Sequence, residues 1–118
     1  MDSDPPTCAL LDEAGAISAR LERARYEFCL VVSAARIVLG SVARGALASS
    51  EGDETAERLM VSGPSTVRPN TPVSELVERL AKRELATAIV TTPGGCLLGV
   101  FHRAEGERYL AGAGQSDA

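Results

Sequence analysis

The chain has 118 residues, a formal net charge of −4, and a composition that is 45% hydrophobic and 24% charged. This length allows one compact domain or two very small ones, and the composition is that of a globular protein rather than a disordered one. No apolar run reaches the ~20 residues that span a bilayer, and the acidic start MDSDPPTC is unlike a signal peptide. We therefore expect a cytoplasmic protein with no membrane contact.

The first half of the chain predicts a helix followed by a hairpin. We expect residues 1–6 to be a disordered lead and Thr7 to end a short strand. Apolar residues at helical spacing then predict a helix with a buried face, and two β-rich runs, FCLVV and RIVLGSV, flank a turn at 33–36. Asp53 is expected to cap a further helix over ETAERLM. The buried helical positions are Ala14, Ile17, Leu21 and Ala24.

The second half predicts the same order of elements. Thr71 is a suitable N-cap, and Pro72 fits the first helical position because its missing N–H costs nothing there. The strands ATAIVTT and CLLGVF flank a turn at 93–95, and HRAEGERYL predicts a short helix. The last residues, AGAGQSDA, are typical of a frayed tail. The buried helical face is expected to consist of Val73, Leu76, Val77 and Leu80.

The two halves form an internal repeat with a shift of 59 residues and no gap. Seven identities occur over 43 pairs, and apolar positions agree more often still. Both copies contain Leu-Gly near the end of their last strand and an arginine four residues after that glycine. The identical pairs are Thr7 and Thr66, Arg20 and Arg79, Leu21 and Leu80, Val31 and Val90, Leu39 and Leu98, Gly40 and Gly99, and Arg44 and Arg103.

The repeat predicts an α+β fold of two β-α-β-β-α units packed together through their small sheets. One such unit cannot bury both faces of its sheet, whereas two can cover each other. We expect a first repeat over 7–52, a linker helix and loop over 53–65, a second repeat over 66–112 and a flexible tail over 113–118. The start at Met1 and the polar tail suggest a complete, free-standing product.

This pattern resembles a tandem pair of CBS domains, also called a Bateman module. The second copy carries the likeness most clearly, in TV-x-P before a helix that begins at a proline, a β strand, a glycine turn and LLGVF. The first copy matches more faintly through CLVVSAARIVLGSVARGAL. The resemblance covers about residues 7–112 and implies a regulatory module that binds an adenosyl compound, such as AMP, ADP, ATP or S-adenosylmethionine, and needs no cofactor.

The family's ligand signature is Gly, two apolar residues, Thr or Ser, two further residues, and Asp or Asn. In the second copy these positions are Gly99, His102 and Glu105. The resemblance implies that His102 contacts a phosphate and that Glu105 accepts hydrogen bonds from the ribose diol, with Arg68 or Arg103 adding positive charge. The implied ligand-binding residues are Ser65, Val67, Leu85, Ala86, Thr87, His102, Arg103 and Glu105.

The first copy lacks these groups. Its hydroxyl and carboxylate positions are Ala43 and Ala46, and Phe28 stands where the second copy has Thr87. A ring at that position is expected to fill the cleft, so the first site is predicted to be degenerate. The same losses favour an alternative reading, in which the chain is a structural, dimerisation or protein-interaction module with empty clefts.

Other functions have less support. The family usually forms dimers, so we expect a homodimer that acts in trans on a partner protein. Cys96 and His102 are the closest nucleophile–base pair, but a straight strand separates them by about 20 Å, and no nucleophile elbow is present; we expect no enzyme. The few basic residues form no stripe and aromatic residues are rare, which argues against nucleic-acid binding.

Cysteine usage predicts neither a zinc site nor disulfides. The three cysteines, Cys8, Cys29 and Cys96, stand singly without CxxC spacing, and His102 is the single histidine. A structural zinc site needs four ligands at characteristic spacings. We expect the cysteines to be small buried hydrophobic residues with reduced thiols.

Overall fold

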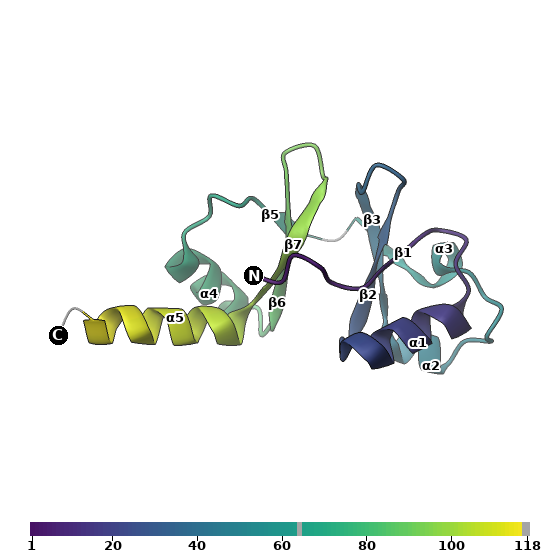
Figure 1. Cartoon of the computed structure of the whole chain (residues 1–118), viewed down its shortest axis with the longest axis horizontal. Coiled ribbons are helices and arrows are strands. Elements are labelled where there is room, and N and C mark those ends of the chain that lie inside the picture. The colour runs from purple at the N-terminus through teal and green to yellow at the C-terminus, as the bar shows by residue number, and fades with distance from the viewer. Residues whose placement is uncertain (64, 117–118) are drawn as a thin grey trace.

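The structure, a computed structural model, describes residues 1–63 and 65–116, and side chains as far as residue 112. It consists of two units, each with a small sheet and outer helices (Figure 1). The elements of the first unit are β1 (Thr7–Cys8), α1 (Ala14–Ala24), β2 (Phe28–Val32), β3 (Val38–Ala43), α2 (Arg44–Ala48), α3 (Ala56–Leu59) and β4 (Val61–Ser62). Those of the second unit are β5 (Thr66–Val67), α4 (Val73–Lys82), β6 (Thr87–Thr91), β7 (Leu97–His102) and α5 (Arg103–Ser116).

The two units repeat the same strand pairing. In each unit a short strand runs parallel to the first strand of a hairpin, as in β1–β2 and β5–β6, and the hairpin strands are antiparallel. Thr7 pairs with Leu30, and Thr66 pairs with Ile89, which preserves the shift of 59 residues. The predicted α+β fold with two CBS-type units is confirmed.

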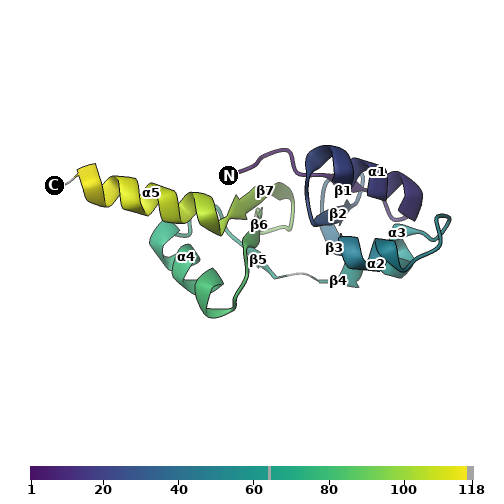
Figure 2. The same ribbon diagram turned by 90° about the horizontal axis from the view of Figure 1, so that it is seen from below.

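The units pack sheet against sheet, as predicted. Figures 1 and 2 show the two hairpins side by side, with α1 and α2 outside one sheet and α4 and α5 outside the other. A shared core lies between the sheets, and burial of each of its large aliphatic side chains stabilises the fold by about 1.5–3 kcal/mol. It contains Leu30, Ile89, Leu97 and Val100, with Tyr26, Phe28, Val32 and Val38 packed against them.

The hairpin turns also join across the pair. The amide of Val38 donates to the carbonyl of Gly95 at 3.0 Å, and the amide of Leu97 donates to the carbonyl of Arg36 at 2.9 Å. Arg36 and Gly95 are equivalent positions and both adopt positive φ, 64° and 90°. The two turns are therefore related by an approximate two-fold axis.

The segment over 1–6, predicted to be disordered, has a defined path. Asp2 exchanges two backbone hydrogen bonds with Val100, at 2.9 and 2.8 Å. This pairing is the counterpart, 59 residues on, of the pairing between Ser41 and Val61 in the first unit. The start of the chain thus lies beside the second sheet as β4 lies beside the first, and part of the predicted linker completes the first sheet.

This pairing explains why both copies require Leu-Gly. A Cβ atom on Gly40 would lie 2.7 Å from the carbonyl oxygen of Val61, and one on Gly99 would lie 2.5 Å from that of Asp2. Real Cβ atoms do not approach backbone oxygen so closely, because such contacts are strongly repulsive. Each glycine is needed where a further backbone segment crosses its strand.

Three local predictions were wrong. Helix α4 begins at Val73 with Pro72 as its N-cap, and α3 begins at Ala56 with Thr55 as its N-cap; within the described residues no side chain caps either helix. Neither Thr71 nor Asp53 therefore has the predicted capping role. The last helix is longer than predicted, because α5 continues to Ser116, and residues 117–118 lie outside the described part.

Candidate functional site

A cavity of about 310 Å³ lies in the second unit, between α4 and the start of strands β5 and β6. Leu76 and Leu80 are buried on the inner face of α4 and form its apolar wall. Hydroxyl groups come from the strand side, and two arginines come from the exposed side of the helix. The lining residues are Ser65, Thr66, Val67, Leu76, Arg79, Leu80, Arg83, Leu85, Thr87 and Ala88.

Four of the eight predicted ligand residues line this cavity: Ser65, Val67, Leu85 and Thr87. Ala86 lies next to it in sequence but is not among the described lining residues. Its carbonyl instead accepts a hydrogen bond of 2.8 Å from the amide of Arg103. That bond ties the start of β6 to the start of α5, so Ala86 serves the backbone rather than the cavity wall.

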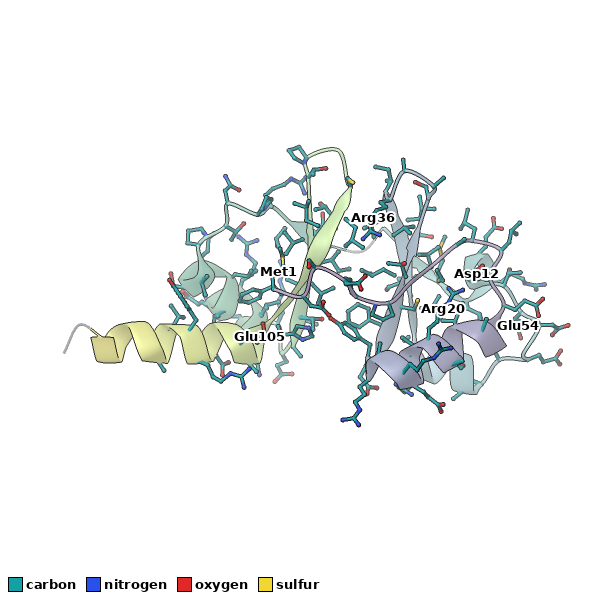
Figure 3. The ribbon with its side chains drawn as sticks, in the orientation of Figure 1. Met1, Asp12, Arg20, Arg36, Glu54 and Glu105 are labelled. Carbon is teal, nitrogen blue, oxygen red and sulfur yellow. The ribbon has the colours of Figure 1, made fainter. Side chains whose placement is uncertain are left out.

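The other predicted polar groups face a different part of the molecule. The Nε2 atom of His102 lies 3.0 Å from the hydroxyl oxygen of Tyr26, and the Glu105 carboxylate lies 3.6 Å from the α-amino group of Met1 (Figure 3). The Arg103 guanidinium pairs with Glu107 at 3.1 Å. The structure therefore separates His102, Arg103 and Glu105 from the cavity that the other predicted residues form.

The contact of His102 belongs to a hydrogen-bond chain across the two units. Tyr26 donates its hydroxyl proton to the Asp2 carboxylate, so its oxygen is left to accept from His102. This arrangement assigns the proton of a neutral His102 ring to Nε2. The rings of Tyr26 and His102 also meet edge to face, with centroids 5.5 Å apart.

Two pKa values reflect this chain. The hydrogen bond from Tyr26, with a second from the amide of Asp4, lowers the pKa of the Asp2 carboxyl below its ordinary value. Burial, together with the hydrogen bond to the Asp2 carboxylate, raises the pKa of the Tyr26 hydroxyl. Both shifts favour the neutral phenol bonded to the ionised carboxylate.

The first unit has a cavity at the equivalent place, of about 380 Å³. Its arginine, Arg20, is engaged: Nη1 donates to the Asp12 carboxylate at 2.8 Å and to the Thr7 carbonyl at 3.0 Å (Figure 3). The predicted blocking residue, Phe28, packs between the sheets against Tyr26 instead. The lining residues are Asp4, Pro5, Pro6, Thr7, Arg20, Arg23 and Ala24.

Sequence reasoning missed Arg79 and Arg83 in the second cavity, and Asp2 and Tyr26 beside His102. A signal for Arg79 existed, because it is identical to Arg20 under the repeat shift. Tyr26 and Asp2 offered none, because their repeat counterparts are Leu85 and Val61. Only the packing of one unit on the other brings them to His102.

The cysteines are as predicted in part. Cys8 and Cys29 are buried in the core of the first unit, whereas Cys96 is half-buried in the second hairpin; all three are free thiols. Among the described residues, no three His, Cys, Asp or Glu side chains lie close enough together to hold a metal ion. No helix in the described part is long and apolar enough to cross a membrane.

Solved structures with this architecture cover nearly the whole chain. An acetoin utilization protein (AcuB) from Vibrio cholerae superposes with a TM-score of 0.84 at 17% identity, over 100% of this chain and 93% of that one. The CBS domains of a transcriptional regulator from Streptococcus pneumoniae give 0.80 at 16%, over 91% and 93%. The chain has the fold of a CBS domain pair.

A further CBS domain pair, that of the protein MJ0100, was solved in complex with 5′-methylthioadenosine and S-adenosyl-L-methionine. It superposes on this chain with a TM-score of 0.78 at 15% identity, over 96% of this chain and 93% of that one. No protein-family model matches the sequence, and no curated protein matches it. The likeness between this chain and the CBS pairs therefore lies in the fold.

Proposed function

We propose that the chain is a CBS-pair regulatory module that binds an adenosyl compound in the cavity of its second unit and acts in trans on a partner protein. One observation carries this proposal: the cavity brings together Ser65, Val67, Leu85 and Thr87, which the family resemblance had assigned to adenine. Its volume of about 310 Å³ lies at the lower end of the range of small-molecule sites.

The cavity wall suits a purine ring. Leu76, Leu80 and Leu85 offer apolar surface for its faces, and the hydroxyls of Ser65 and Thr87 offer hydrogen bonds to its edge. Two proteins of the same fold were solved with such compounds, MJ0100 with 5′-methylthioadenosine and S-adenosyl-L-methionine, and the Mg²⁺ channel MgtE with ATP. These complexes support an adenosyl ligand here.

The family's sugar and phosphate groups are otherwise engaged in this chain. His102 is bonded to Tyr26, and Glu105 faces the α-amino group of Met1. A ligand that used them would have to displace these contacts. This observation favours the second candidate function, a structural or protein-interaction module without a ligand, for which the alanines at 43 and 46 also speak.

We also propose a cytoplasmic homodimer without catalytic activity. Tyr109 on α5 and Leu85 beside α4 are 64% and 45% exposed, which provides apolar surface for a second copy. Catalysis has little support, because Cys96 and His102 lie at opposite ends of β7, about 20 Å apart along an extended strand.

A thermal-shift screen tests the ligand. AMP, ADP, ATP, NAD, S-adenosylmethionine and 5′-methylthioadenosine would each be added to the full chain and to Thr87→Phe, which places a ring in the cavity. At a hundred times its dissociation constant, a ligand stabilises the fold by about 2.7 kcal/mol, on the order of ten degrees in Tm. The matched control, Ala24→Phe, adds the same bulk to the first cavity.

We expect one compound to raise the Tm of the wild type and of Ala24→Phe but not that of Thr87→Phe. Glu105→Ala reports separately whether the family's carboxylate takes part. A flat response of the wild type to every compound at millimolar concentration would contradict the proposal and favour the interaction module.

A further inference from the structure

The second cavity differs from the first in its charged groups. Arg79 and Arg83 are one turn apart on α4 and both reach its rim, and none of its described lining residues is acidic. In the first cavity Asp4 belongs to the lining, and the position of Arg83 is taken by Ala24. The two equivalent cavities therefore present opposite balances of charge.

The freedom of the arginines differs as well. Arg20 is fixed by Asp12, and the residue equivalent to Asp12 in the second unit is Thr71, which has no carboxylate. Arg79 pairs instead with Glu75 of its own helix at 2.9 Å, with side chains 45% and 55% exposed. Exposed pairs of this kind are weak and exchange easily with water or a ligand.

The guanidinium of Arg83 makes no ion pair or side-chain hydrogen bond within the part of the chain that the structure describes. It stands at the C-cap of α4, where the helix dipole favours a cation. An arginine held there without a carboxylate partner presents all its donors to the rim of the cavity. Arginine is well suited to phosphate because its planar donors match two phosphate oxygens.

We propose that the second cavity is a phosphate-selective site, in which the guanidinium groups of Arg79 and Arg83 bind the phosphate of a small phosphomonoester. The apolar part of the ligand lies against Leu76 and Leu80. The inference rests on the proposed function in that it uses the same cavity, but it assigns the phosphate to α4 rather than to His102. It makes the arginines the residues that select between charged and uncharged ligands.

Acidic residues around the site do not reverse this balance. Glu75 is the partner of Arg79, Glu78 is paired with Lys82 at 3.4 Å, and Glu84 follows Arg83. All three side chains are exposed to solvent, which screens their repulsion of a phosphate in the cavity. Direct contact between two guanidiniums and one phosphate is less screened, so attraction dominates.

Calorimetric titrations of the full chain test the inference. The ligands are adenosine, AMP, ribose 5-phosphate and inorganic phosphate, at low and moderate salt. We expect AMP to bind about tenfold more tightly than adenosine, an advantage that shrinks as salt rises. Arg79→Gln and Arg83→Gln should each weaken AMP about five- to tenfold and leave adenosine within about twofold.

Arg23→Gln is the matched control, because it removes the same charge from the rim of the first cavity. It should leave both affinities unchanged. Thermal unfolding of each variant checks that it folds, which we expect because Arg79 and Arg83 are exposed. Charge reversal in Arg83→Glu gives a second test and should weaken AMP further than Arg83→Gln.

The outcomes separate the two proposals. Equal affinity for adenosine and AMP, unaffected by the arginine variants, overturns the phosphate site and leaves the adenosyl module standing. Binding of ribose 5-phosphate or inorganic phosphate that the arginine variants weaken, without binding of adenosine, supports the phosphate site and overturns the adenosyl ligand. Absence of binding by all four compounds overturns both.

Discussion

At the scale of single residues, Gly40 and Gly99 connect the repeat to the path of the chain. Each lies where a further segment crosses the last strand of its sheet, and the crossing residues, Val61 and Asp2, are themselves 59 positions apart. Met60 and Met1, which precede them, also pack on the two glycines. The start of the chain is therefore part of the second unit.

Substitution of Gly99 tests this crossing. In Gly99→Ala the new methyl group would meet the carbonyl of Asp2, so the backbone must move, and we expect a loss of about 1–3 kcal/mol in the free energy of unfolding. Gly94→Ala is the control, because its Cβ would meet its nearest neighbour, the Thr92 hydroxyl, at 3.9 Å. Urea denaturation measures both; equal stability of the two variants would contradict the crossing.

The turn at Arg36 offers a stabilising change. Arg36 adopts a φ of 64°, where the equivalent residue in the second unit is Gly95. A side chain in this region costs about 1–2 kcal/mol, and glycine loses about 0.5–1 kcal/mol through its freedom in the unfolded chain. Arg36→Gly should therefore stabilise the protein by about 0.5–1 kcal/mol, measured by urea denaturation. Destabilisation would show that the Arg36 side chain contributes more than its strain.

At the scale of elements, the packing of α5 on α4 differs from that of α2 on α1. Gly106 is buried, and a Cβ on it would lie 2.7 Å from Cγ2 of Val77 and would also clash with the ring of Phe101. The equivalent residues in the first unit are Leu47 and Val42, both buried. A large residue on the strand with glycine on the helix has replaced the reverse arrangement, so the cores fill similar space by different means.

A double-mutant cycle measures this exchange of volume. Gly106→Ala should destabilise the fold by about 1–3 kcal/mol through overpacking. In a Phe101→Val background the ring is gone, so the penalty of Gly106→Ala should fall, which gives a coupling energy of about 0.5–3 kcal/mol. Additive effects in chemical denaturation would mean that Phe101 and Gly106 do not share a packing constraint.

Sequence periodicity predicted the elements better than their ends. Ile17, Leu21, Leu76 and Leu80 occupy the buried helical positions as predicted, because burial of an apolar stripe determines helix placement. The caps at Asp53 and Thr71 were wrong, since propensity for a cap does not specify which residue turns first. The length of α5 was missed because AGAGQS, rich in glycine, carries no helical signal of its own.

At the scale of the whole molecule, a hydrogen-bond chain joins the start of the chain to both units. Asp2 comes from the first segment, Tyr26 from the end of α1 and His102 from the end of β7. Half of the predicted ligand residues were placed correctly at the cavity from the family pattern alone. The positions of His102 and Glu105 depend on contacts between the units, which local sequence patterns do not contain.

The chain makes stability depend on pH at both extremes. The folded-state pKa of Tyr26 is raised, so its contribution is complete below its ordinary pKa of 10.0 and is lost as pH rises above it. The folded-state pKa of Asp2 is lowered, so its contribution is present above 3.8 and is lost as pH falls below it.

Tyr26→Phe and Asp2→Asn remove these two dependences. Tyr26→Phe should lower stability by about 1 kcal/mol at pH 7 and flatten the fall in Tm above pH 10. Asp2→Asn should flatten the fall below pH 4. Thermal unfolding across pH measures both, and His102→Gln, which retains a donor, serves as the comparison. Wild-type pH profiles in both variants would contradict the hydrogen-bond chain.

The central claim is that a small ligand occupies the second cavity and not the first, and amide NMR tests it most directly. Titration of labelled protein with AMP should shift the amide signals of residues 65–67 and 85–88 and leave those of residues 7–8 unchanged. Shifts centred on residues 7–8 and 20–24, or no shifts at millimolar AMP, would contradict the claim.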